Sequence, residues 1–211
     1  MATEPAPEKQ RGRPAKKGRS DDILDAALDE FSTKGFDAAR LDDVARKAGI
    51  SKGTIYLYFD SKEQLFEGVV RRWILPKVMA AEDLLEHHRG PVEDLVRAQV
   101  HGIYNELAGT RLRQILRLMI AEGPRFPHLV DFYFETVIQR GLQALRRTIQ
   151  LGVERGEFRA TALPDYPQTV LGPAITAAVW KILFDTHQPL DLDGLFETHF
   201  DILMNGLKKD R

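Results

Sequence analysis

The sequence contains no cysteine. A disulfide framework and a thiolate metal site are therefore excluded, and the chain is suited to a reducing compartment. The sequence also lacks a run of about 18 apolar residues, which a membrane-spanning helix needs. Its first 20 residues have no apolar core of the kind found in secretory signals. We therefore expect a cytoplasmic protein without a membrane partner.

Common catalytic motifs are also missing. The chain has no H-E-x-x-H helix, no glycine-rich phosphate loop and no G-x-S-x-G. His87 and His88 are adjacent, so on a helix they point about 100° apart and are poorly placed to share a metal ion. We expect no catalytic residue, no metal site and no cofactor. An all-helical enzyme is the least favoured interpretation.

The chain as a whole has almost no excess of either charge, because its 30 basic and 31 acidic residues leave a formal net charge of -1. The N-terminal segment differs. It carries basic residues and no acidic residue over positions 9–19, namely Lys9, Arg11, Arg13, Lys16, Lys17 and Arg19. Such a run is typical of a solubilising tail or of an arm that binds phosphate. Since residues 1–19 are also rich in proline and glycine, we predict a disordered basic arm there.

The rest of the chain is predicted to be all α-helical, with about nine helices. Hydrophobic residues make up 43% of the chain, enough for a packed core, and no segment has strand-like alternation bounded by hairpin turns. Ser20 is predicted to cap the first helix and Gly35 to end it. Pro76 should kink or end the fourth helix. Later helices are predicted near residues 91–107, 110–121, 128–155, 166–185 and 191–208.

Residues 41–59 have the pattern of a helix-turn-helix. A short helix over 41–48 is followed by Gly49 and by a second short helix that Ser51 can cap. Ile50 and Ile55 can fill the shared core, and the other face of the second helix is largely polar. That face suits the DNA major groove, which admits one helix. Hydroxyl groups there can bond phosphates or base edges, and Leu57 can touch a thymine methyl.

Residues 20 to about 70 resemble the DNA-binding domain of the TetR family of regulators. The resemblance rests on Phe31 and the Gly35-Phe36 pair, on VA at 44–45 and AGI at 48–50, on SKGTIYLYF over 51–59, on SKE at 61–63 and on LF at 65–66. It implies that the third helix enters the major groove and that Lys62 contacts phosphate. The family commonly has Thr or Ser before the second helix, where this chain has Ala39-Arg40. Arg40 is the alternative phosphate contact.

The arm contains a second possible DNA contact, because the RGRP segment at 11–14 resembles the core of an AT-hook. A narrow A·T-rich minor groove attracts inserted arginine. We expect the arm to order on A·T-rich DNA beside the operator. The complete set of predicted DNA-binding residues is Arg11, Arg13, Arg40, Ser51, Lys52, Gly53, Thr54, Tyr56, Leu57, Tyr58 and Lys62.

The predicted domains are the arm at 1–19, the helix-turn-helix domain at 20–66 and an antiparallel helical domain at 67–211. The resemblance implies that the third of these binds a small-molecule effector. For each candidate residue taken singly, an ordinary core or surface position is the favoured interpretation, and the existence of a pocket is what the resemblance implies. These candidates are Trp73, His101, Tyr104, Asn105, Arg117, Glu122, Phe126 and Phe132.

The last two helices combine small residues with an apolar stripe. Two such helices from each of two subunits can form a four-helix bundle, although both could simply belong to the core of one chain. We favour a homodimer, because one recognition helix alone reads too few base pairs and a dimer reads a palindromic site. The predicted interface residues are Gly172, Ala174, Ala177, Ala178, Leu195, Phe196, His199, Ile202 and Leu203.

The sequence thus predicts a regulator, by default a repressor, that binds operator DNA as a homodimer and is released by a small hydrophobic effector. The alternative is an architectural DNA-binding protein that has no effector.

Overall fold

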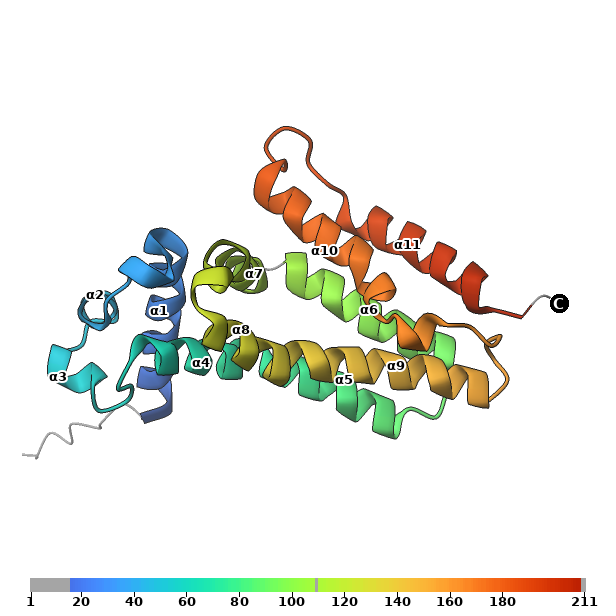
Figure 1. Cartoon of the computed structure of the whole chain (residues 1–211), viewed down its shortest axis with the longest axis horizontal. Helices are drawn as coiled ribbons and strands as arrows, with labels where there is room; N and C mark the ends of the chain where they lie inside the picture. The colour runs from blue at the N-terminus through green and yellow to red at the C-terminus, as the bar shows by residue number, and fades with distance from the viewer. Residues whose placement is uncertain (1–15, 109, 210–211) are drawn as a thin grey trace, which may run out of the picture.

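The computed structural model describes residues 16–108 and 110–209. Within these ranges the regular elements are helices and no β-strand forms, which confirms the all-α prediction (Figure 1). The helices are α1 (Lys16–Ala38), α2 (Leu41–Lys47), α3 (Lys52–Ile55), α4 (Lys62–Trp73), α5 (Leu75–His87), α6 (Val92–Ala108), α7 (Thr110–Glu122), α8 (Pro127–Tyr133), α9 (Gln139–Glu154), α10 (Gln168–Leu183) and α11 (Leu192–Leu207). None of the described helices is long and apolar enough to cross a membrane.

The first helix starts earlier than its sequence pattern suggests. α1 begins at Lys16, so the prediction of a start at Ser20 was wrong. Residues 16–19 have no apolar period to reveal a helix, yet lysine and arginine favour helix. Arg11 and Arg13 lie outside the described residues. The helix is interrupted at Gly35, whose φ of 80° and ψ of 165° are open to glycine alone. The next residue, Phe36, is fully buried.

The turn between α2 and α3 forms as its sequence predicts. Gly49 has a φ of 67°, and the amide of Ile50 donates to the carbonyl of Ala45 at 2.9 Å. Ser51 caps α3, because its hydroxyl accepts a hydrogen bond of 3.1 Å from the amide of Thr54. The helix is short, but hydrogen-bonded turns continue it to Phe59, whose amide donates to the carbonyl of Ile55 at 3.0 Å.

Pro76 separates α4 from α5 as expected. It lies in the first turn of α5, where proline is tolerated, and Ile74 joins the two helices with a φ of -106°. The single helix predicted over 128–155 consists of α8, a π-helical turn at Phe134–Ile138 and α9. Gly156, with a φ of 75°, follows α9 as predicted.

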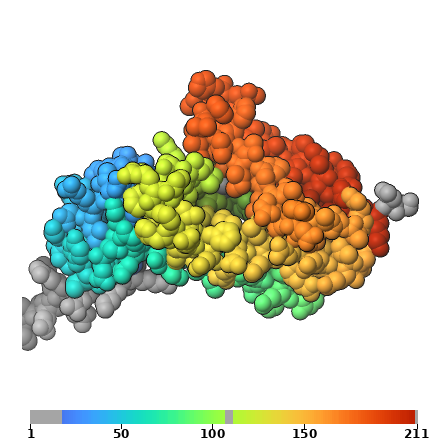
Figure 2. All heavy atoms as spheres, viewed as in Figure 1, coloured from blue at the N-terminus to red at the C-terminus, as the bar shows by residue number. Residues whose placement is uncertain are grey.

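Two hydrophobic cores hold the molecule together. The first joins α1–α4 to α7 and α8, because Ile115, Leu118 and Leu129 are buried among the side chains of the first four helices. The second lies between α6, α9, α10 and α11 and includes Val96, Ile149 and Phe200. Figure 1 shows α1–α4 at one end of the molecule, α10 above its middle and α11 running from there towards the other end. In Figure 2, α10 stands out from the body on one side.

Candidate DNA-binding interface

The surface of α3 carries side chains that have no place in the core. Ile55 is fully buried and anchors α3 to the first core. The residues that follow turn outward, so that Tyr56 is 46% exposed and Leu57 is 83% exposed. Ser51, Lys52 and Gly53 are exposed as well. An exposed leucine beside an exposed tyrosine leaves apolar surface in water, which a binding partner would cover.

Lys52 is exposed but already paired. Its ammonium donates to Asp42 of α2 at 2.8 Å, and this hydrogen bond raises the pKa of Lys52. Beside it, the hydroxyls of Ser51 and Thr54 lie 2.7 Å apart and share a hydrogen bond. Asp42 was missed at the sequence level, because a contact between residues ten positions apart on two helices has no local signature. The acid holds the lysine near the start of α3.

Other predicted DNA-binding residues are less accessible. Thr54 is half-buried, and Tyr58 is half-buried against the first core. Lys62 is half-buried, and its ammonium donates to the carbonyl oxygens of Phe36 and Asp37. Arg40 is exposed at the start of α2 and makes no side-chain capping bond there. As the sequence predicts, α2 therefore begins without a hydroxyl cap.

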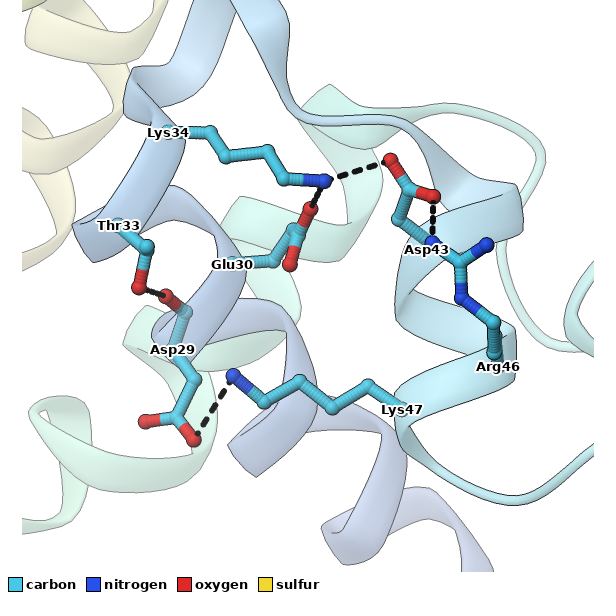
Figure 3. A network of polar contacts seen from close by, with 7 residues as sticks. All are labelled: Asp29, Glu30, Thr33, Lys34, Asp43, Arg46 and Lys47. Atoms are coloured by element: carbon cyan, nitrogen blue, oxygen red, sulfur yellow. Dashed lines mark hydrogen bonds and ion pairs between the residues drawn. The ribbon is translucent and has the colours of Figure 1, made fainter.

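A network of charges fixes α2 against α1 (Figure 3). Lys34 lies between Glu30 and Asp43 and forms ion pairs with both. The hydrogen bond between Lys34 and Asp43 raises the pKa of the lysine and lowers the pKa of the aspartate. Arg46 also pairs with Asp43, and Lys47 pairs with Asp29 at 3.2 Å. The network ties α2, the first helix of the motif, to α1.

The candidate pocket residues are divided between the two cores. Trp73, Phe126 and Phe132 pack against the first core. Tyr104 belongs to the second core, and burial raises the pKa of its hydroxyl. His101 and Asn105 are exposed neighbours on α6, with 3.2 Å between the histidine Nδ1 and the amide nitrogen. The remaining two candidates are Arg117, which is exposed, and Glu122, which lies 3.5 Å from Arg125.

Two hollows in the described part of the chain are grooves open to the surface. One has a volume of about 480 Å³ and is lined mainly by apolar residues of α7 and α8, such as Ile120 and Val130. The other has a volume of about 350 Å³ and lies between α1 and α7, with Asp29 and Arg111 in its wall. Neither groove is lined by any of the candidate pocket residues.

The candidate dimer residues fall into two sets. Five are buried against the subunit's own helices: Ala174, Ala177, Ala178, Phe196 and His199. Packing within one chain accounts for the burial of these five. Ile202 is 66% exposed, whereas Gly172, Leu195 and Leu203 are half-buried. The sequence pattern alone does not distinguish the residues of α10 and α11 that face the core from those that face solvent.

Comparisons with known proteins agree with this architecture. Residues 23–69 match the family described as bacterial regulatory proteins, tetR family. Residues 86–195 match the tetracyclin repressor-like C-terminal domain. The chain is 25% identical over 198 residues to the HTH-type transcriptional repressor KstR2 of Mycolicibacterium smegmatis, an alignment that covers 92% of each protein.

Two further comparisons differ in extent. The uncharacterized HTH-type transcriptional regulator YvdT of Bacillus subtilis is 36% identical over 85 residues, which is 40% of this chain and 36% of that protein. The structure of the regulator FadR of Bacillus subtilis in complex with stearoyl-CoA has a TM-score of 0.74 at 20% identity, over 88% of this chain and 97% of FadR. Since the C-terminal family model alone spans residues 86–195 of the 211, the chain belongs to the TetR family and is a transcriptional regulator, not an enzyme.

Proposed function

We propose that the protein is a repressor that binds a palindromic operator as a homodimer and leaves it when a small hydrophobic effector binds. In this proposal α3 of each subunit enters the major groove. The exposed pair of Tyr56 and Leu57 is the observation that carries it, because the two side chains form apolar surface on a helix that the fold turns outward. Lys52 adds a positive charge beside them, and Arg40 adds another at the start of α2.

The basic arm extends the proposed contact with DNA. Arg11 and Arg13 are the residues proposed to enter an A·T-rich minor groove beside the operator. Removal of residues 1–18 should weaken binding and make log K fall less steeply with log salt concentration, because fewer counterions are released. An unchanged salt slope would rule the arm out as a DNA contact.

The homodimer is supported by the outer faces of α10 and α11. Apolar side chains there are exposed on a single subunit, including Ile175 at 41%, Leu183 at 57% and Ile202 at 66%. Replacing Ile202 with Glu would place a charge in the proposed interface. We expect sedimentation analysis to show a dimer for the unaltered chain and monomers for I202E. A monomeric unaltered chain at micromolar concentration would rule out the homodimer.

The effector is proposed to be apolar because mainly apolar residues line the groove between α7 and α8, and because the similar regulator FadR has been solved in complex with stearoyl-CoA. An effector can shift the protein between two states only through its different affinity for them. The test is a gel-shift assay with the protein's own promoter DNA, with and without a panel of hydrophobic compounds. Binding that one compound releases would support the proposal.

The second candidate is a DNA-binding protein with no effector. It is favoured by one observation, which is that both hollows described above are grooves open to solvent. It would be supported if the promoter were bound and no compound in the panel altered the affinity. The two candidates share the DNA interface and differ only in this response.

A further inference from the structure

The ion pair between Lys52 and Asp42 joins the two helices of the helix-turn-helix. The ammonium of Lys52, at the start of α3, donates to the carboxylate of Asp42 in α2 at 2.8 Å. Both side chains are exposed, Lys52 at 68% and Asp42 at 48%. The hydrogen bond raises the pKa of Lys52, so the lysine keeps its positive charge at neutral pH. The pair therefore places a carboxylate on the surface that is proposed to meet DNA.

Asp42 has a different set of partners from the acid beside it. Asp43 pairs with Lys34 of α1 and with Arg46, and these contacts hold α2 against α1 (Figure 3). Among the described residues, Lys52 is the one cation that forms an ion pair with Asp42. Both acids lie in the first turn of α2, where negative charge suits the positive end of a helix. Because Asp43 remains there, α2 keeps an acid in its first turn if Asp42 is replaced.

DNA offers Lys52 the same kind of partner that Asp42 already provides. Carboxylate and phosphate oxygens are both anionic acceptors for an ammonium group. Binding that does not depend on base sequence comes essentially from contacts between cations and phosphates. A phosphate that takes the ammonium of Lys52 replaces one anion with another and leaves the Asp42 carboxylate facing DNA without its cation. Lys52 therefore gains less from DNA than an unpaired lysine would.

We propose that Asp42 competes with DNA for the ammonium of Lys52 and so lowers the affinity of α3 for the phosphate backbone. The proposal rests on the proposed DNA-binding function, since the competition has an effect only where α3 meets a duplex. A purely structural pair, which braces α3 against α2, would have the opposite effect. Loss of a brace weakens DNA binding, whereas loss of a competitor strengthens it.

The sign of the change in Asp42→Asn separates these two roles. The full chain and the variant are titrated with a fluorescent duplex of random sequence at several salt concentrations, because this binding does not depend on an operator. We expect D42N to bind about two- to thirtyfold more tightly, since each subunit of the proposed dimer loses one competing acid. We also expect log K to fall more steeply with log salt concentration. Unchanged or weaker binding by D42N would overturn the proposal.

The gain in D42N should depend on Lys52. The same titrations with Lys52→Met and with the double variant D42N/K52M measure this dependence. We expect the loss of the acid to raise the affinity less when Lys52 is absent, because only direct repulsion between Asp42 and phosphate is then relieved. An equal gain with and without the lysine would overturn the competition.

Glu93→Gln is the matched control. Glu93 lies in the first turn of α6, as Asp42 lies in the first turn of α2. It pairs with Lys208 at 2.9 Å, and the two side chains are 37% and 51% exposed. E93Q therefore removes the same charge from a similar ion pair outside α2 and α3, and we expect it to leave the DNA affinity unchanged. A gain as large as that of D42N would assign the effect to net charge and overturn the proposal.

A measurement without DNA tests the ion pair itself. The pH dependence of Lys52 acetylation, quantified by mass spectrometry, reports the pKa of the lysine. We expect this pKa to be lower in D42N than in the unaltered chain, because the hydrogen bond to Asp42 raises it. An identical pKa would overturn the proposal and leave the proposed function standing. If the unaltered chain binds neither the random duplex nor its own promoter DNA at low salt, it is the proposed function that fails.

Discussion

The two cores of this protein differ in what they join. The second core packs α6, α9, α10 and α11 together and remains within the C-terminal region. The first core crosses from the DNA-binding region into that region, because α7 and α8 contribute Ile115, Leu118 and Leu129 to it. The helix-turn-helix therefore shares its interior with helices of the C-terminal region. A displacement of α7 or α8 would change the packing of α1 and α4. The second core instead supports the outer faces of α10 and α11, where a partner subunit is proposed to bind, and contains no residue of the helix-turn-helix.

Truncation of one isoleucine in each core provides the strongest test of this difference. Ile115 of α7 and Ile149 of α9 are both essentially fully buried, at 0% and 1% exposure. Replacing either with alanine should lower the free energy of unfolding by about 2–5 kcal/mol. We expect only I115A to weaken DNA binding as well, measured by anisotropy at a temperature where both variants are folded. Equal DNA affinities for the two variants would show that packing in the first core does not affect how α3 binds DNA.

Substitution at Gly35 tests the contact between α1 and the end of α7. A Cβ built there lies 2.7 Å from Glu122 Oε1, and the backbone conformation is one that other residues avoid. We expect Gly35→Ala to cost about 1–3 kcal/mol of unfolding free energy in urea titrations. Gly49→Ala is the matched control, because its φ is also positive but nothing lies within 4 Å of the added carbon. Its cost should be smaller, about 1–2 kcal/mol. The interpretation fails if the control is the more damaging variant.

The charge network between α1 and α2 gives a smaller effect. Lys34→Ala leaves the carboxylate of Glu30, whose side chain is 8% exposed, without its ion pair. Lys47→Ala removes only a pair with Asp29, whose side chain is 56% exposed. We expect K34A to lower the melting temperature more than K47A does. The free energy of unfolding of K47A should lie within about 0.5 kcal/mol of that of the unaltered chain. Equal melting temperatures would mean that Glu30 does not need its partner.

The smallest expected effect concerns His199 of the second core. Burial lowers the pKa of its imidazole from the usual value of 6.5, and its Nδ1 lies 3.2 Å from the Tyr104 hydroxyl. The unfolded chain therefore binds a proton more readily than the folded one, and stability falls as the pH drops below about 6.5. His199→Gln should reduce this loss between pH values of about 7.5 and 5.5, measured by urea unfolding. An identical pH dependence in the variant would contradict the assignment to His199.

Local chemistry made the DNA-binding motif predictable. Gly49 has the positive φ that the turn needs, Ser51 caps α3, and Ile55 is buried beneath it, as the pattern of short helices indicates. Pro76 likewise marks the junction of α4 and α5. Each of these features depends on neighbours within a few positions, so the sequence itself carries the signal.

Features that depend on distant packing were not predictable. The burial of Ile115 beside α1, the pairing of Lys52 with Asp42 and the contacts of Lys62 with residues 36 and 37 join different helices. An apolar stripe also does not reveal which neighbour it meets, and Ala177 and Phe196, which the pattern makes equally suitable for a partner helix, lie in the subunit's own core. The π-helical turn at Phe134–Ile138 has no sequence signal that we can identify.

The central claim is that the outward surface of α3 binds duplex DNA, and Leu57→Glu tests it most directly. Leu57 is 83% exposed, so the change should alter the free energy of unfolding by no more than about 0.5 kcal/mol. A carboxylate facing phosphates should weaken binding to a duplex of the protein's own promoter DNA by about 100-fold or more. If L57E folds and binds that duplex as tightly as the unaltered chain, α3 does not lie against DNA and the account is wrong.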